Sequence, residues 1–581
     1  MTKKRSLIAI ILAVILILSS CAPSIQTPED TDTENSTLQP PEASDTLPPP
    51  EDPDRRITLF DGKGWSYGTT TASACTDFEK SFLTSLQKEL STLINDPLPS
   101  ATDKEQKGDE VPEIIIGYTA HPIMRSLYAN LAYGDACVKV VGNKILIASY
   151  TPEGFNMLLY HFFKIVRNGR SNGRVETTVS ELETLISADP YLNRIPKAGV
   201  DALPSISDCG INQTLLLYKG VGVDAYESYV ASIDGSPVQS TSERGSHFAT
   251  YVQGNDTVNV SFTKSDGALR IIYTINCSPT ELFSKQETNK ICEPLLIMRG
   301  MGWDVEGAEP KTNGLCIIIR LSDGRFIIVD GGWDRQRDAD DLYKLLSEHT
   351  PKEMKTTVAA WIVTHAHEDH HSTFAFDFPD SYRDKVKVEK VIFNPPMGGI
   401  YIGSNPSGHS KNEKDVISAI GKFGAKLVRA HVGDKYYVGD AEIDVLYTVD
   451  LVYPEAFEYY NTSSLMLSIR IAGQRIMITG DGSNVAFDKM ADIFGQSLKC
   501  DIVQVAHHGY GTGVSAKEST GIVRGYGFMA PSLVLWPASS SGYQNGLKYT
   551  YNTSLIRLPT VKKIIVAGET NHIIELPYKV S

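Results

Sequence analysis

The hydrophobic and polar positions divide the chain into segments of different character, beginning with an export signal. Basic residues at positions 3–5 precede an unbroken apolar run from Leu7 to Leu18. A membrane-spanning helix needs about 20 apolar residues, so this shorter run favours a cleavable signal over residues 1–20 rather than a short membrane anchor. Residues 21–54 are rich in Pro, Thr, Ser, Glu and Asp, which predicts a disordered linker.

Residues 55–200 alternate between helical and strand-like patterns. Apolar residues recur at helical spacing over 75–94. Strands are expected at 113–117 and 144–148, and a second helix at 153–166. This order predicts a small α/β domain. The sequence EIIIGYT, followed by VKVVGNKILIASYTPEGFNMLLYHFF, resembles the non-catalytic domain that precedes the catalytic domain in some exported glycoside hydrolases, and it indicates architecture only.

The remaining patterns predict a β-rich unit and a larger C-terminal domain. Residues 201–293 alternate apolar and polar positions between turn residues. From 294 to 581, apolar strands end in acidic residues or histidines, and they fall into two sets, about 315–364 and 464–567. Helical stretches separate the two sets, so we predict an αββα sandwich with two packed sheets and outer helices. The fold class is α/β throughout.

Composition narrows the class of protein. A chain of 581 residues with 41% hydrophobic and 21% charged residues is typical of a soluble protein with several domains. Its formal net charge of −14 gives no general basic field for a phosphate backbone, which disfavours a dedicated nucleic-acid partner. A local basic patch remains compatible with that charge.

The end of the signal has the form of a lipid attachment site. Leu-Ser-Ser-Cys21 resembles the bacterial lipobox, and the resemblance implies that Cys21 is lipidated and anchors a lipoprotein at the extracytoplasmic face of the cell membrane. The other cysteines are widely scattered, without the paired short spacings of a zinc ribbon.

The most informative chemistry follows the strand expected at 358–364. The sequence continues His365-Ala-His367-Glu-Asp369-His370-His371. So many ionisable side chains at the end of a buried strand would be poorly solvated unless a cation compensated them. Zinc accepts such nitrogen and carboxylate ligands. The segment therefore predicts a loop that wraps a metal ion.

The pattern His-x-His-x-Asp-His after an apolar strand is the signature of the metallo-β-lactamase superfamily, and residues 295–575 resemble that superfamily. Asp330, at the end of FIIVDGG, resembles the motif that orients the metal loop. Asp481, at the end of RIMITGD, resembles the aspartate that bridges two metals. His507, in DIVQVAHHG, resembles the fifth-motif ligand.

One motif departs from the superfamily pattern. Where its members usually have a histidine, twenty residues before Asp481, this chain has Asn461 in the sequence NTSSL. An amide oxygen is a weaker zinc ligand than an imidazole. This form resembles the subgroup that contains the hydrolase-like domain of ComEC-type competence proteins. His409 and His431 are alternative third ligands, although each is more readily explained as a surface residue.

The resemblance implies two metal sites, occupied by one or two zinc ions, with manganese or iron as alternatives. The predicted ligands are His365, His367 and Asn461 for one metal, Asp369, His370 and His507 for the other, and Asp481 between them. His371 and His508 follow ligand histidines directly. Each is either an orienting or proton-transfer residue or a hydrogen-bonded structural histidine.

These residues predict a hydrolase. A bound metal lowers the pKa of its water toward about 7. The resemblance implies that Asp369 would orient the resulting hydroxide, and either water or His508 would protonate the leaving group. We expect a surface-anchored enzyme acting on phosphodiester or other ester bonds in envelope polymers or extracellular nucleic acid. The alternative is a non-catalytic surface protein that binds glycan and carries a degenerate hydrolase domain. Antibiotic-degrading β-lactamase activity is disfavoured, because Asn461 is not the pattern of those enzymes.

Overall fold

The computed structural model describes residues 49–104, 107–276, 279–300, 313–396, 398–511 and 520–579. The predicted signal, the lipidation site at Cys21 and most of the linker lie outside the described residues. Within the described ranges, none of the helices has both the length and the apolar character needed to cross a membrane. The domains below all lie in one unit of the chain, Thr46–Ser581.

The N-terminal α/β domain is built on a six-stranded sheet of order β3-β2-β4-β6-β5-β9. Its strands are β2 (Gly68–Thr71), β3 (Ser100–Thr102), β4 (Glu113–Ile116), β5 (Asp135–Val141), β6 (Lys144–Ser149) and β9 (Thr184–Ser187). Helices α2 (Asp77–Ile94) and α4 (Pro152–Asn168) share one hydrophobic cluster with this sheet, and α3 (Pro122–Asn130) contributes to another. A capping box at Thr76 begins α2, which buries the regularly spaced Phe82, Leu86 and Leu90.

Three shorter strands and one helical turn complete the N-terminal domain. Strands β1 (Arg56–Phe60), β7 (Arg170–Ser171) and β8 (Arg174–Thr178) form a separate sheet, and α5 (Val179–Leu182) follows it. The helices and strands expected from the apolar spacing between 75 and 166 are therefore present as α2, β4, β6 and α4.

A six-stranded antiparallel sheet of order β10-β11-β15-β14-β13-β12 follows. Its elements are β10 (Ser205–Asp208), β11 (Gln213–Lys219), α6 (Val223–Ser232), β12 (Gln239–Glu243), β13 (Ser246–Gln253), β14 (Asp256–Thr263) and β15 (Ala268–Thr274). Successive side chains of a strand point to opposite faces. Thus Ile271 packs in a cluster with residues of the N-terminal domain, whereas Ile272 packs in a cluster with the C-terminal domain. Burial of both faces explains the apolar pairs along these strands.

The C-terminal domain is the predicted αββα sandwich. One sheet has the order β22-β21-β19-β18-β17-β16-β30, with β20 beside β19, and the other has the order β23-β24-β25-β26-β27-β28-β29. The first sheet comprises β16 (Leu295–Met298), β17 (Ile317–Arg320), β18 (Phe326–Val329), β19 (Thr357–Ile362), β20 (Lys387–Val388), β21 (Lys390–Ile392), β22 (Lys426–Val428) and β30 (His572–Glu575). The second comprises β23 (Lys435–Val438), β24 (Ala441–Tyr447), β25 (Met466–Ile471), β26 (Gln474–Ile478), β27 (Ile502–Gln504), β28 (Leu533–Trp536) and β29 (Lys563–Val566).

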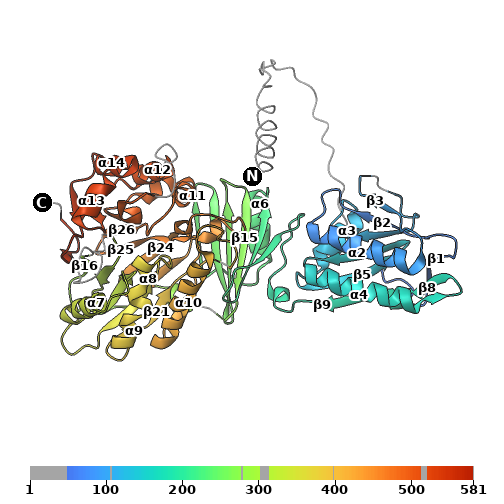
Figure 1. The fold of residues 1–581 in the computed structure, drawn as a ribbon, viewed down its shortest axis with the longest axis horizontal. Helices are drawn as coiled ribbons and strands as arrows, with labels where there is room; N and C mark the ends of the chain where they lie inside the picture. The colour runs from blue at the N-terminus through green and yellow to red at the C-terminus, as the bar shows by residue number, and fades with distance from the viewer. Residues whose placement is uncertain are drawn as a thin grey trace, which may run out of the picture. The chain divides into compact units, whose positions relative to one another are not determined.

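Helices cover the outer faces of the two sheets. They are α7 (Gln336–His349), α8 (Glu368–Ala375), α9 (Asp377–Tyr382), α10 (Pro406–Phe423), α11 (Asn484–Phe494), α12 (Thr520–Met529), α13 (Ser540–Gly546) and α14 (Thr550–Ile556). Helices α11 to α14 lie on one side of the sheets, and α7, α9 and α10 lie on the other (Figure 1). One core cluster joins apolar side chains of both sheets, among them Ile327 and Ile362 of the first and Leu467 and Ile476 of the second.

The strand order brings four chemically important loops to the same edge of the sandwich. In the first sheet β18 runs parallel to β19, and in the second β26 runs parallel to β27. Asp330 and His365 follow the first pair, and Asp481 and His507 follow the second pair. Loops at the carboxyl ends of parallel strands are the usual place for a site in α/β folds.

Candidate metal centre

The loop after β19 is fixed by a buried carboxylate. Asp330 Oδ1 accepts a hydrogen bond from the Thr364 backbone N–H at 2.8 Å, and Asp330 Oδ2 accepts one from the Thr364 hydroxyl at 2.7 Å. A third bond joins Asp330 Oδ2 to Nδ1 of His370 at 2.7 Å. These bonds tie the end of β18 to both ends of the metal loop, which is the role the sequence predicted for Asp330.

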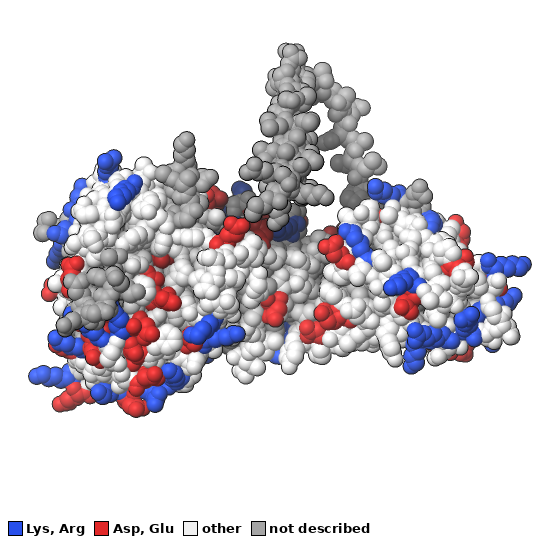
Figure 2. Space-filling model, in the orientation of Figure 1, with Lys and Arg blue, Asp and Glu red and all other residues white. Residues whose placement is uncertain are grey.

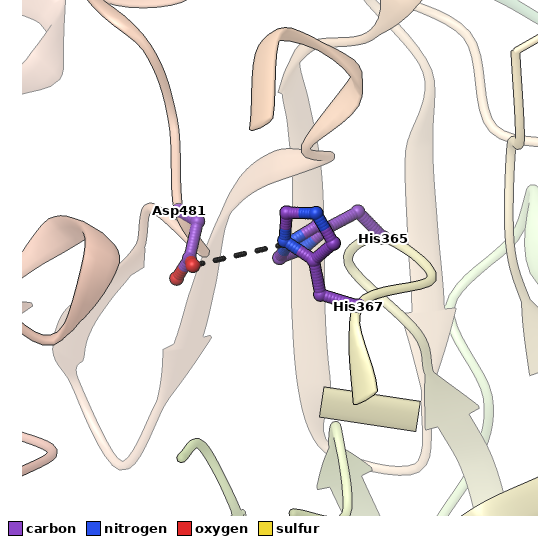
Figure 3. A group of neighbouring side chains, drawn as sticks. All are labelled: His365, His367 and Asp481. Carbon is purple, nitrogen blue, oxygen red and sulfur yellow. Dashed lines mark hydrogen bonds and ion pairs between the residues drawn. The ribbon is translucent and has the colours of Figure 1, made fainter. Parts of the chain in front are cut away.

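The first cluster of ligand atoms comes from His365, His367 and Asp481. His365 Nε2 lies 3.0 Å from His367 Nδ1 and 3.8 Å from Asp481 Oδ2. Figure 3 shows the two imidazoles facing the carboxylate from the loop after β19, with Asp481 approaching from the opposite sheet. His365 and His367 therefore lie in a loop around a common point, as predicted, whereas Asp369 and His370 belong to the first turn of helix α8 and not to the predicted loop.

The second cluster comes from Asp369, His370 and His508. His508 Nε2 lies 3.0 Å from His370 Nε2 and 3.0 Å from Asp369 Oδ2. Asp481 reaches this cluster with its other oxygen, because Oδ1 lies 3.1 Å from His370 Nε2 and 3.5 Å from His508 Nε2. Asp481 thus stands between the two clusters, as predicted.

The hydrogen bonds at Nδ1 leave the Nε2 atoms free to bind metal. His370 Nδ1 faces Asp330, and His508 Nδ1 lies 3.1 Å from the Pro537 carbonyl oxygen. These acceptors hold a proton on Nδ1, so Nε2 is the nitrogen that faces the cluster and would bind a metal. Such partners orient metal-binding histidines and raise their basicity. Two buried groups of nitrogen and carboxylate donors with this orientation fit divalent metals such as zinc.

Burial and charge set the protonation of the ligands. Burial lowers the pKa of His365 well below its usual value and that of His367 to about 4, so both are neutral, as ligands must be. Burial also opposes a charge on His370, but the carboxylates of Asp481, Asp369 and Asp330 outweigh it and raise the His370 pKa well above its usual value. A metal must therefore displace a proton from His370.

The structure corrects the assignment of the two consecutive histidines. The sequence placed His507 with Asp369 and His370, but His508 occupies that place, so the fifth-motif assignment is wrong by one residue. His508 is consequently positioned as a ligand rather than as the predicted proton donor. Both histidines have left-handed backbones, with φ of 51° and 53°. Each such residue costs about 1–3 kcal/mol, and strain of this kind clusters at functional sites.

The third-motif position has its own partners. Asn461 is buried, and its Nδ2 donates a hydrogen bond to the Tyr459 hydroxyl at 3.1 Å. Its Oδ1 has no hydrogen-bond partner among the described residues. A metal-ligand role for Asn461 therefore stays a prediction.

The alternative histidines lie elsewhere. His431 is buried between Asp450 (2.7 Å) and Gln213 (3.0 Å), so it is an internal residue rather than the surface residue expected. The ring centroid of His409 lies 5.0 Å from that of His367, but His409 stacks on Tyr460 and joins neither cluster. His371 is also buried, and its Nδ1 is bonded to the carbonyl oxygen of His367 at 2.8 Å. This contact fits the structural reading.

Some residues that hold the ligands in place belong to no motif, and the sequence did not identify them. Asn313 donates to Asp369 Oδ2 at 2.5 Å, and Thr364 and Tyr459 hold His365 and His507 by hydrogen bonds of 3.1 and 3.3 Å. Ordinary polar residues of this kind become recognisable only when distant segments meet.

Residues 310–516 match the family described as the metallo-beta-lactamase superfamily. No curated protein matches the chain. Among similar solved structures are the metallo-beta-lactamase fold protein YhfI from Bacillus subtilis (11% identity, 48% of this chain and 99% of that one, TM-score 0.31) and a diphosphatase from the PhnP family (13%, 50% and 100%, TM-score 0.29). Another is a beta-lactamase domain protein from Burkholderia ambifaria (13%, 43% and 58%, TM-score 0.18). With its αββα fold and its two His/Asp clusters, the C-terminal part of the chain is a metallo-beta-lactamase superfamily domain of the kind that supports metal-dependent hydrolysis.

Proposed function

We propose that this protein is a surface-anchored metal-dependent hydrolase of phosphodiester or other ester bonds. The observation that carries the proposal is the pair of buried ligand clusters that share Asp481. A bound divalent metal there supplies a Lewis acid and lowers the pKa of a water toward about 7. Metals held by the two clusters would supply charge stabilisation to both the attacking and the leaving oxygen, which favours displacement at a phosphorus or carbonyl centre.

The exposure of the side chains separates residues that bind metal from residues that face the substrate. The side chains of His365, His370 and His508 are fully buried, and their role is to bind the metals. Asp369 keeps 13% of its side chain exposed and His507 keeps 22%. Substrate therefore reaches the centre from the side of these two residues. Asp369, held by Asn313, would orient the attacking water through a carboxylate oxygen.

Substrate and location are inferred from the whole chain. The signal and Cys21 favour a lipid anchor on the extracytoplasmic face of the membrane, which would give access to envelope polymers or extracellular nucleic acid. Figure 2 shows acidic and basic side chains interspersed over the drawn face of the C-terminal domain. That mixture, with a net charge of −14, favours an ester substrate recognised at the metal centre over a nucleic acid held by a broad basic surface.

The test combines metal analysis with a chromogenic phosphodiester. The purified protein should contain zinc, manganese or iron and hydrolyse the ester, and His367→Ala should abolish hydrolysis. His409→Ala is the matched control, because His409 lies next to His367 and joins neither cluster. Bound metal without hydrolysis of any ester tested would favour the glycan-binding alternative. For the anchor, Cys21→Ser should move the protein from the membrane fraction to the soluble fraction, and an unchanged distribution would contradict it.

A further inference from the structure

We propose that His507 is the third imidazole of the metal site at His365 and His367, in place of the histidine that the chain lacks at Asn461. The two consecutive histidines would then serve different metals. This assignment rests on the proposed metal-dependent function and adds the ligand set of one site.

The orientation of the Asp481 carboxylate separates the two sites. Its Oδ2 atom lies 3.8 Å from His365 Nε2 and 3.8 Å from His507 Nε2. Its Oδ1 atom lies closer to His370 Nε2 and His508 Nε2, at 3.1 and 3.5 Å. Each oxygen therefore faces two imidazoles, and His507 is on the side of His365.

The distance from His507 Nε2 to Asp481 Oδ2, 3.8 Å, is close to the spacing of two ligands on one ion. Two ligands of a tetrahedral zinc, each about 2.0–2.1 Å from the metal, are about 3.3 Å apart. His507 stands at the open side of the first cluster, with 22% of its side chain exposed. His507 is not one of the three residues whose ligand atoms lie within 4.8 Å of one another in the first cluster, so its imidazole would have to move toward His365 and His367 to share their ion.

The backbone explains how neighbouring residues reach one centre. Consecutive side chains of a regular strand point to opposite faces. His507 and His508 instead follow β27 within the turn η6 (Ala506–Gly509), both with left-handed φ values. The His507 N–H also donates to the Gly480 carbonyl oxygen at 3.1 Å, which fixes this turn next to Asp481.

The surroundings of His507 select the tautomer that a ligand needs. The Tyr459 hydroxyl donates its single proton to the Gly511 carbonyl oxygen at 3.2 Å and accepts a bond from Asn461 Nδ2 at 3.1 Å. Its remaining lone pair can only accept. The contact of 3.3 Å to His507 Nδ1 is therefore a bond donated by the imidazole, which leaves Nε2 unprotonated and directed at Asp481.

Asn461 acquires a different role from the predicted one. It holds Tyr459, which holds His507, so Asn461 is a positioning residue two steps from the metal. Partners of this kind typically change metal affinity by about 10–100-fold. Oδ1 of Asn461 has no hydrogen-bond partner in the described parts of the chain, which favours direct ligation instead, and the experiment must distinguish the two roles.

The experiment measures zinc content and affinity of the full chain by mass spectrometry and chelator competition. Wild type should bind two zinc ions, and His507→Ala should lose one. Because His507 and His365 would serve the same ion, His365→Ala/His507→Ala should lose no more zinc than His365→Ala alone. Tyr459→Phe and Asn461→Ala should each weaken one zinc about 10–100-fold without removing it. His409→Ala, with both zinc ions retained, controls for altered folding.

Each other outcome has a defined meaning. Two zinc ions of unchanged affinity in His507→Ala, or loss of both in the double variant, would overturn the assignment while leaving the proposed function intact. Loss of one zinc in Asn461→Ala but not in Tyr459→Phe would make Asn461 the ligand and overturn the positioning role. A folded wild-type protein without metal would overturn the proposed function together with this inference.

Discussion

The Asp330 carboxylate lies 2.7 Å from Nδ1 of His370, and both side chains are completely buried. We expect Asp330→Asn to weaken the metal at His370 about 10–100-fold, because the amide is a poorer partner for the imidazole N–H than the carboxylate. Asparagine tolerates the left-handed φ of 56° at this position, so the fold should be retained. Chelator competition measures the affinity.

A second buried pair in the same domain supplies the control for Asp330→Asn. Asp450 Oδ2 also lies 2.7 Å from Nδ1 of a histidine, His431, which belongs to neither ligand cluster. Asp450→Asn should lower stability without changing metal affinity. Equal losses of affinity in both variants would show that Asp330 acts only through folding.

Metal binding should release a proton at neutral pH. Burial opposes the charge on His370, but neighbouring carboxylates raise its pKa well above the usual value, so the metal-free protein is protonated there at pH 7. The metal must displace this proton, and metal affinity should therefore increase with pH until the His370 pKa is passed. Titration calorimetry in two buffers of different ionisation enthalpy should show release of about one proton. Heats that do not depend on the buffer would contradict this expectation.

The sequence predicted the parts of this centre that depend on local pattern. Asp330, His365 and Asp481 each follow an apolar run, and the two parallel strand pairs bring the ends of these runs together. The choice between His507 and His508 depends on two left-handed φ values, which no spacing of apolar residues encodes.

Partners from distant segments were equally hidden in the sequence. The side-chain amide of Asn461 donates a hydrogen bond to the Tyr459 hydroxyl, and the orientation of this amide depends on the conformation of the folded loop. His431 bonds Gln213, which lies 218 positions earlier in the chain. His431 is buried because the antiparallel sheet, which carries Gln213, packs against the C-terminal domain. A single sequence does not reveal this packing, so it gave no reason to place His431 in the interior.

Glu413 should make stability depend on pH. Burial raises its pKa to about 7, although the Tyr460 hydroxyl, 2.7 Å away, favours the carboxylate. A carboxyl group with a raised pKa stabilises the folded state below its unfolded pKa of 4.5, and this contribution is lost as the pH rises toward 7. Glu413→Gln should therefore gain stability relative to wild type above pH 7, by at most about 3 kcal/mol. Urea unfolding at pH 5 and pH 8 measures the difference.

The control for Glu413 lies on the same helix. Asp415 forms an ion pair with the exposed Lys411 at 2.8 Å, and Asp415→Asn should change stability by less than about 1 kcal/mol at either pH. A Glu413→Gln variant with the same stability difference from wild type at both pH values would show that Glu413 does not titrate between them.

Asp434 should hold the antiparallel β10–β15 sheet to the C-terminal domain. It is buried, and its Oδ1 accepts hydrogen bonds from Gln239 (3.1 Å), Thr250 (2.8 Å) and Asn259 (2.9 Å), all on that sheet. Asp434→Ala would leave these buried donors without their acceptor, at a cost on the order of 4 kcal/mol. We expect calorimetry to show a lower melting temperature and a separate transition for the released sheet.

A surface ion pair between the same two parts of the chain provides the comparison for Asp434. Lys219 Nζ lies 2.9 Å from Glu455 Oε1, with 59% and 70% of the side chains exposed. Solvent and salt screen such a pair, so Glu455→Gln should cost less than about 1 kcal/mol and leave a single transition. If Asp434→Ala behaved like Glu455→Gln, the apolar contacts of residues such as Phe248 and Ile272 would suffice to hold the sheet, and the buried carboxylate would contribute only to its alignment.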